Sequence, residues 1–237
     1  MTVDFVTYCC PKDIDKLHEN IVDHVNSHGY DFDNKFIVYQ RCFPSDEAHG
    51  FSAKLASLKE SISNLKTVSI LDGMYNDILT RNGINPNNAE ADDLTHGWGH
   101  SHYWRHHCVN HLVALEQSEA DYIVMADADC HIKSQPDSWV LKAIDVLKRN
   151  PEALIVSPSD GSTQKKTQTM SQQLFLVDRK RLQEIDFDLP FEGFKEGGPM
   201  QEYYFMLEGR IGRYMEKNNL WRYLLDSSYR YWHKAWH

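Results

Sequence analysis

The 237-residue chain lacks the features that mark membrane-spanning proteins and secreted disulfide-rich proteins. No apolar run approaches the ~18–20 residues that a membrane-spanning helix needs. The N-terminal segment has neither a basic region nor a long apolar region, so we do not expect a secretory signal peptide. The five cysteines form an odd set without a Cys-x-x-Cys pair, unlike a disulfide framework or a zinc ribbon. We therefore expect a cytoplasmic protein with reduced thiols and no stable membrane insertion.

Positive charge is also scarce. The chain has 25 Lys and Arg against 34 Asp and Glu, and its net charge of −9 argues against a protein that coats nucleic acid. Residues 209–237 differ, because they hold six Lys and Arg against two acidic residues and are rich in Trp and Tyr. Such a segment suits an anionic small ligand. The hydrophobic fraction of 41% is enough for a packed core and excludes wholesale disorder.

Strand patterns and helix patterns alternate along the first two thirds of the chain, which predicts an α/β domain with a mostly parallel central sheet. Strands are expected at 3–9, 35–42, 67–71, 122–126 and 153–156. Helices are expected around 14–25, 48–64, 104–118 and 136–147. The remainder is mixed, with a flexible loop at 157–169, a strand at 172–178 and a short helix at 201–209. We find no internal repeat and no linker, so we expect a single domain over 1–237, with a nucleotide-binding half at 1–132 and an acceptor half at 133–237.

The most informative segment is the run Tyr-Ile-Val-Met-Ala-Asp-Ala-Asp at 122–129. A wholly apolar stretch suits a buried parallel strand, and Asp127 and Asp129 follow it directly. In extended backbone, residues two apart point the same way, so both carboxylates can face one point. That point lies beyond the carboxyl end of the strand, where open α/β sheets bind ligands. Two carboxylates there form a hard oxygen site suited to Mg²⁺ or Mn²⁺.

The Asp-x-Asp pattern alone is weak evidence, because the sequence contains it four times, beginning at Asp13, Asp31, Asp127 and Asp186. The first pair opens a helix, where acidic residues favour the dipole. The second and fourth pairs lie in polar turns. The pair at Asp127 is distinguished by the apolar run before it, and the alternative is that its carboxylates cap the following helix.

Taken together, the buried strand, the Asp-Ala-Asp and the preceding Gly-rich turn and helix at 97–118 resemble glycosyltransferases of the GT-A fold. Family 2 and the small retaining GT-A families are nearest in layout. The resemblance implies a Rossmann-like domain that transfers a hexose from a UDP-sugar, most simply UDP-glucose or UDP-galactose, to an acceptor hydroxyl. It also implies a divalent ion, Mn²⁺ or Mg²⁺, that bridges the donor diphosphate to the enzyme.

The resemblance also implies how the donor is bound. Thr7 and Tyr8 end the first strand and are expected to hold the uracil. Asp72 follows the third strand and is expected to replace a nucleoside-binding Asp that the second strand lacks. Asp127 is expected to contact the ribose or sugar and to share the metal. Arg105 is expected to contact the diphosphate or base, since a guanidinium suits planar anion recognition.

The resemblance implies two further assignments, which involve residues of the second half of the chain. Asp129 and His233 are expected to complete the metal shell with Asp127, and Lys234 to contact the diphosphate. The alternative for this aromatic C-terminal segment is core packing. Glu202 follows a Gly-Gly and is expected to act as the base for the acceptor hydroxyl in an inverting enzyme, or to hold a sugar hydroxyl in a retaining one. The alternative for Glu202 is an exposed helix face.

Two other classes of protein are open on the sequence. A nucleotidyltransferase on a similar α/β sheet is one, although the chain has Cys-Cys-Pro-Lys where a Gly-rich phosphate loop belongs. A non-catalytic carbohydrate-binding protein that uses the Trp- and Tyr-rich segment is the other. Such a protein would bind sugar without nucleotide or metal.

Overall fold

A computed structural model describes residues 1–9, 14–41, 50–86, 101–128, 130–133, 137–171, 173–187 and 207–233. The first half alternates strand and helix as predicted. Its elements are β1 (Val3–Cys9), α1 (Ile14–Ser27), β2 (Asn34–Arg41), α2 (Phe51–Ser61), β3 (Leu65–Leu71), η3 (Asp72–Met74), α3 (Tyr75–Arg81), α5 (Ser101–Gln117) and β4 (Tyr122–Asp127).

The second half mixes short strands and helices. Its elements are β5 (Cys130–Ile132), α6 (Trp139–Arg149), β6 (Ala153–Ser157), β7 (Lys166–Thr167), β8 (Leu174–Asp178), α7 (Arg179–Gln183), α8 (Leu207–Asn218), β9 (Trp221–Leu224), η4 (Ser227–Tyr229) and β10 (Tyr231–His233). No described helix combines the length and the apolar character that crossing a membrane requires.

The described strands form a large sheet in the order β3-β2-β1-β4-β8-β6-β9-β7 and a small sheet of β5 with β10. The four neighbouring strands β3, β2, β1 and β4 run parallel, and β6 is parallel to β9. Strand β8 is antiparallel to both β4 and β6, and β7 is antiparallel to β9. The prediction of a mostly parallel sheet with a mixed C-terminal portion is therefore confirmed.

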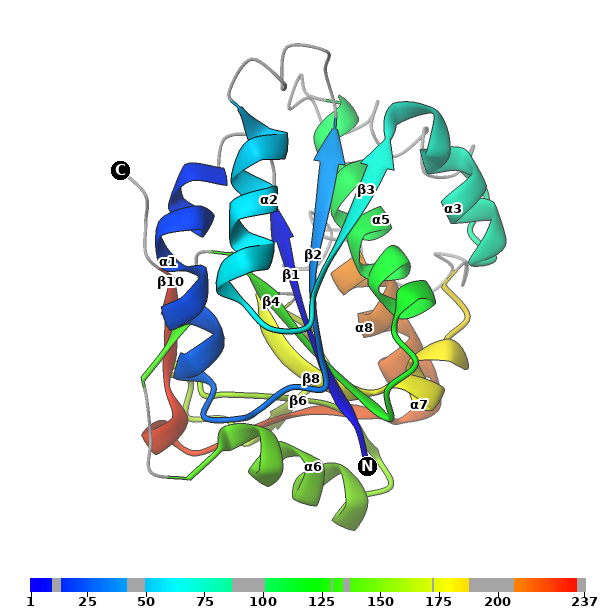
Figure 1. Ribbon diagram of the computed structural model, residues 1–237. Coiled ribbons are helices and arrows are strands. Elements are labelled where there is room, and N and C mark those ends of the chain that lie inside the picture. The colour runs from blue at the N-terminus through cyan, green and yellow to red at the C-terminus, as the bar shows by residue number, and fades with distance from the viewer. Residues whose placement is uncertain are drawn as a thin grey trace.

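Helices cover both faces of the large sheet, because every central strand is apolar on both sides. One hydrophobic cluster joins α1, α2 and α6 to the sheet, and the other joins α3, α5, α7 and α8 to its opposite face (Figure 1). Strand β4 shows the reason, since its residues from Tyr122 to Ala126 are all buried. Alternate side chains of β4 enter the two clusters, with Val124 in the first and Met125 in the second.

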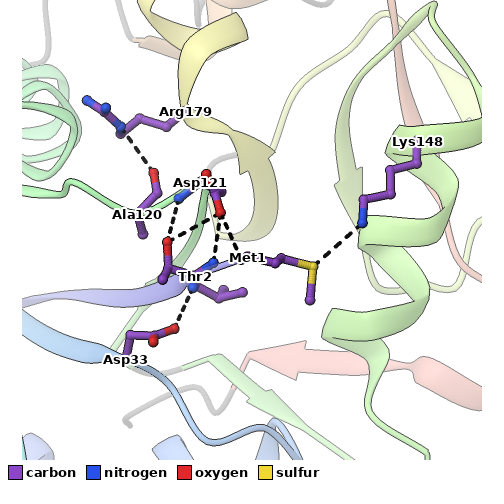
Figure 2. Close-up of polar contacts among 8 residues, drawn as sticks. Met1, Thr2, Asp33, Ala120, Asp121, Lys148 and Arg179 are labelled. Atoms are coloured by element: carbon purple, nitrogen blue, oxygen red, sulfur yellow. Dashed lines mark hydrogen bonds and ion pairs between the residues drawn. The ribbon is translucent and has the colours of Figure 1, made fainter.

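Hydrogen bonds fix the amino ends of the adjacent strands β1 and β4 (Figure 2). The Thr2 amide donates to Asp121 Oδ2 at 2.9 Å, and the Asp121 amide donates to Thr2 Oγ1 at 3.1 Å. Arg179 Nε donates to the Ala120 carbonyl at 3.1 Å, and the Val3 amide donates to Asp33 Oδ2 at 2.7 Å. These contacts satisfy polar groups at the amino ends of the strands. In open α/β sheets ligands bind at the opposite, carboxyl ends.

Several element boundaries differ from the predicted ones. The predicted helix at 201–209 overlaps α8, but α8 runs on to Asn218, and residues 201–206 lie outside the described residues. The segment 157–169 contains the short edge strand β7, which pairs with β9. Asp160, in the same segment, lies 3.5 Å from Arg222 in an ion pair. The sequence predicted a flexible loop here because the segment has no large apolar residue. A two-residue edge strand leaves no local pattern, since it depends on its partner strand.

Candidate functional site

The carboxyl ends of β1 and β4 bring two of the predicted site residues side by side. Tyr8 of β1 is paired in register with Asp127 of β4, and Thr7 is paired with Ala126. Directly opposed residues of parallel neighbours point to the same face, so Tyr8 and Asp127 both lie on the face that α5 covers. Thr7 points to the other face, toward α1 and α2. The carboxyl end of β1 thus carries polar side chains on both faces of the sheet.

Tyr8 is buried between the sheet and α5. Its ring centroid lies 4.3 Å from that of His111, which in turn stacks on Phe175 at 6.0 Å. Burial, with a smaller contribution from the Asp127 carboxylate, raises the pKa of the Tyr8 hydroxyl well above its usual value. The hydroxyl therefore stays protonated as a donor, and it has no hydrogen-bond partner among the described residues.

Two other buried polar groups near this edge share that condition. The hydroxyl of Thr7 and Oδ1 of Asn110, on α5, are buried and make no hydrogen bond within the described part of the chain. Buried polar groups are nearly always paired, so each such group calls for an explanation. The Tyr8 hydroxyl lies near the carboxyl ends of the strands, beyond which open α/β sheets bind ligands.

Asp127 is the last residue of β4 and is partly exposed, as a residue that meets a ligand must be. Its amide donates to the carbonyl of Gln173 at 2.8 Å, which ties the end of β4 to the start of β8. This bond fixes the backbone from which the Asp127 carboxylate projects.

The small sheet brings the C-terminal segment to the same place. Strand β5 begins at Cys130, the residue after Asp129, and runs antiparallel to β10. In that register His233 lies opposite Cys130 and Tyr231 opposite Ile132. The backbone at His233 is therefore next to the chain that follows Asp129, although the two are far apart in sequence. Carboxylate and imidazole together form a donor set that suits Mn²⁺.

The remaining predicted site residues are placed in part or not at all. Asp129, Glu202 and Lys234 lie outside the described residues. For Asp72, Arg105 and His233 the structure describes the backbone alone: Asp72 begins η3 after β3, Arg105 lies in α5, and His233 ends β10. Among the side chains whose placement is described, no three His, Cys, Asp or Glu are grouped to hold a metal ion. The complete ligand set of Asp127, Asp129 and His233 stays a prediction.

Comparison with known proteins bears on the fold of the chain. No family model matches the chain, and no curated protein matches it. Among solved structures, S. aureus TarS 1-349 matches 99% of this chain and 60% of its own length, with a TM-score of 0.52 and 12% identity. The same S. aureus fragment in complex with UDP matches 98% of this chain and 60% of its own length, with a TM-score of 0.50 and 13% identity.

A longer S. aureus TarS structure matches 99% of this chain but 37% of its own length, with a TM-score of 0.52 and 13% identity. This chain thus spans 60% of the length of TarS 1-349 and less of the longer structure. The likeness shows the fold: the chain has the GT-A fold, with a mixed α/β architecture around a large, mostly parallel sheet. The GT-A resemblance inferred from the sequence is confirmed at the level of fold.

Proposed function

We propose that this protein is a metal-dependent glycosyltransferase that transfers a hexose from a UDP-sugar, UDP-glucose or UDP-galactose, to an acceptor hydroxyl. The observation that carries the proposal is the meeting of three segments at one sheet edge. The end of β1 brings Tyr8, the end of β4 brings Asp127, and the β5–β10 pair brings the backbone of His233 next to the residue after Asp129. The GT-A fold and the UDP complex of its structural neighbour support the choice of donor.

In this proposal the nucleoside lies at the carboxyl end of β1. Thr7 and Tyr8, at the end of β1, hold it together with Asp72. Asp127, Asp129 and His233 would hold Mn²⁺ or Mg²⁺. When bound, the ion would supply positive charge next to the diphosphate oxygens. Arg105 and Lys234 bind the same diphosphate, so they stabilise the leaving group as its charge develops.

The acceptor side is assigned to the second half of the chain. Glu202 accepts the proton of the attacking hydroxyl, which makes the oxygen a better nucleophile at the anomeric carbon. In a retaining enzyme the same carboxylate would hold a sugar hydroxyl instead. The segment 157–169, which follows β6, is assigned the exclusion of water from the donor, because water would otherwise hydrolyse it.

The deciding experiment measures UDP release from a panel of UDP-sugars with Mn²⁺, with and without EDTA. We expect turnover of one donor that EDTA abolishes. Asp129→Asn is expected to lower the rate by at least about 100-fold, since it removes a charged metal ligand from the diphosphate site. Asp31→Asn is the matched control: Asp31 belongs to another Asp-x-Asp pair and is fully exposed, 3.9 Å from Lys35.

Three outcomes would contradict the proposal. Equal rates for Asp129→Asn, Asp31→Asn and the unaltered protein would reduce the Asp-Ala-Asp to a turn. Release of pyrophosphate from a nucleoside triphosphate would point to a nucleotidyltransferase. Binding of glycans that neither UDP nor EDTA affects would point to a carbohydrate-binding protein.

A further inference from the structure

The predicted metal site is divided between two sheets. Asp127 belongs to the large sheet, whereas Cys130 and His233 belong to the small sheet of β5 and β10. A metal shell built from both requires that the small sheet be held at a fixed distance from the end of β4, because ligand positions must be kept to within about 0.5 Å. The contacts between the two sheets therefore bear on the site.

Backbone hydrogen bonds provide the first of these contacts. The Ser159 amide donates to the Tyr229 carbonyl at 3.0 Å, and the Tyr231 amide donates to the Ser159 carbonyl at 3.1 Å. Ser159 follows β6, so these bonds attach the start of β10 to the large sheet. These bonds hold β10 next to the end of β6. They do not set the distance between β10 and β4, because β8 lies between β6 and β4 in the large sheet.

The side chain of Tyr231 provides the second contact, and it leads to Asp127. Its hydroxyl donates to Oε1 of Gln173 at 3.1 Å and also hydrogen-bonds to Ser171. The backbone carbonyl of Gln173 accepts the amide of Asp127 at 2.8 Å. One residue, Gln173, is thus bonded both to the β4 ligand and to the strand that ends at His233.

The environment of Tyr231 suits a fixed donor. The side chain is buried, with 6% of its surface exposed, and it packs in the same hydrophobic cluster as Cys130 and Ile132 of β5. The cluster fixes the ring, so the hydroxyl is held within hydrogen-bond distance of Gln173.

We propose that Tyr231 and Gln173 form a positioning pair that holds the β5–β10 sheet against the end of β4, so that Asp129 and His233 reach the ion held by Asp127. The pair touches neither donor nor ion. It acts through the backbone of Asp127 on one side and of β10 on the other. The inference rests on the proposed function, since it concerns the metal site of that function.

The test is Mn²⁺ affinity in the presence of saturating UDP, measured from the electron paramagnetic resonance signal of free Mn²⁺. Tyr231→Phe deletes the hydroxyl and leaves the ring in its cluster. We expect it to weaken Mn²⁺ binding by about 10-fold or more, the effect typical of residues that orient metal ligands. Gln173→Met removes the acceptor from a partly exposed position and should also weaken binding, because it deletes the bond from Tyr231.

Tyr223→Phe is the matched control, because it also deletes a tyrosine hydroxyl that donates to a side-chain oxygen. Tyr223 lies in β9, and its hydroxyl donates to Glu152 Oε1 at 2.6 Å, away from β4 and β10. Its Mn²⁺ affinity should equal that of the unaltered protein. In the double variant Tyr231→Phe/Gln173→Met, the loss should match that of Tyr231→Phe alone, since that change already removes the bond to Gln173.

The outcomes separate this inference from the proposed function. Asp129→Asn serves as the reference for loss of the metal site itself. If the unaltered protein binds Mn²⁺ and Asp129→Asn does not, but Tyr231→Phe binds like Tyr223→Phe, the positioning pair is refuted and the proposed function stands. Fully additive losses in the double variant refute the pair as well. If the unaltered protein and Asp129→Asn bind Mn²⁺ equally, the proposed function and the pair fall together.

Discussion

At the residue scale, the buried side chain of His28 is neutral in the folded protein. His28, near the end of α1, is 1% exposed, and its Nδ1 accepts a hydrogen bond from Trp139 Nε1 at 3.0 Å. An accepting Nδ1 places the remaining proton on Nε2 and requires the neutral ring. Burial, reinforced by the neighbouring His24, lowers the pKa of His28 well below its usual value.

This arrangement makes stability depend on pH in a defined window. In the unfolded chain His28 titrates near pH ~6.5, whereas in the folded protein it stays neutral to a lower pH. The stabilisation is complete above pH ~6.5 and is lost as pH falls below that value, by up to about 1.4 kcal/mol per pH unit for one proton. We expect His28→Gln to flatten the fall in unfolding free energy between pH 7.5 and 5.5, measured by urea titration.

The control for this prediction lies on α1, the helix that His28 directly follows. His18 is exposed and meets the Ser57 hydroxyl at 3.3 Å. His18→Gln should retain the pH dependence of the unaltered protein. A slope unchanged by His28→Gln would show that the Trp139 hydrogen bond does not set the protonation of this ring.

At the scale of elements, the sequence predicted correctly those strands that consist of a continuous apolar run. The predicted strand at 3–9 matches β1, and the predicted strand at 122–126 falls short of β4 by one residue. Apolar runs of this length specify a buried strand locally. The same run identified Asp127, because a residue that follows a buried strand must lie at the sheet edge.

Strands β5 and β10 were beyond prediction for a physical reason. Each has three residues, and each exists through pairing with a segment about a hundred positions away. No local periodicity encodes such a pair. Tyr231 and Gln173 were missed with it, since their relation depends on the placement of β10 against β8.

A buried side chain that connects several elements should be costly to substitute, in terms of the free energy of unfolding. Asp4 of β1 is fully buried, and its carboxylate accepts from the Asn34 amide at 3.1 Å, from Asn34 Nδ2 at 2.9 Å and from the Ser118 hydroxyl at 2.7 Å. It thereby joins β1 to β2 and to the chain that follows α5. All of these neighbours are donors, so an amide at this position would place a donor against a donor.

We expect Asp4→Asn to lower the free energy of unfolding by about 1–3 kcal/mol, the cost of leaving buried donors unpaired. Asp121→Asn, at the same edge of the sheet, should cost less, because water replaces the lost contacts of an exposed carboxylate (Figure 2). Urea unfolding at pH 7 measures both variants. Equal losses would mean that the three donors around Asp4 do not depend on its charge.

At the scale of the whole molecule, the large sheet crosses the boundary between the two predicted halves. Strand β4 of the first half pairs with β8 of the second over five residue pairs from Tyr122↔Asp178 to Ala126↔Leu174. Both hydrophobic clusters also draw on both halves; the first holds Val124 of β4 together with Leu176 of β8. A sheet and two clusters that span the boundary should unfold as one cooperative unit, which is what a single domain means physically.

Leu176→Ala tests this cooperativity from the second half. Leu176 is fully buried in β8, so its truncation should cost about 2–5 kcal/mol. Urea midpoints read separately for β1 peptides and β9 peptides, by hydrogen-exchange mass spectrometry, should fall by the same amount. Leu141→Ala is the matched control: Leu141 is 51% exposed on α6, and its truncation should change stability by less than about 0.5 kcal/mol. If β1 peptides kept their midpoint while β9 peptides lost theirs, the chain would consist of two units, and the predicted metal site would depend on how those units dock.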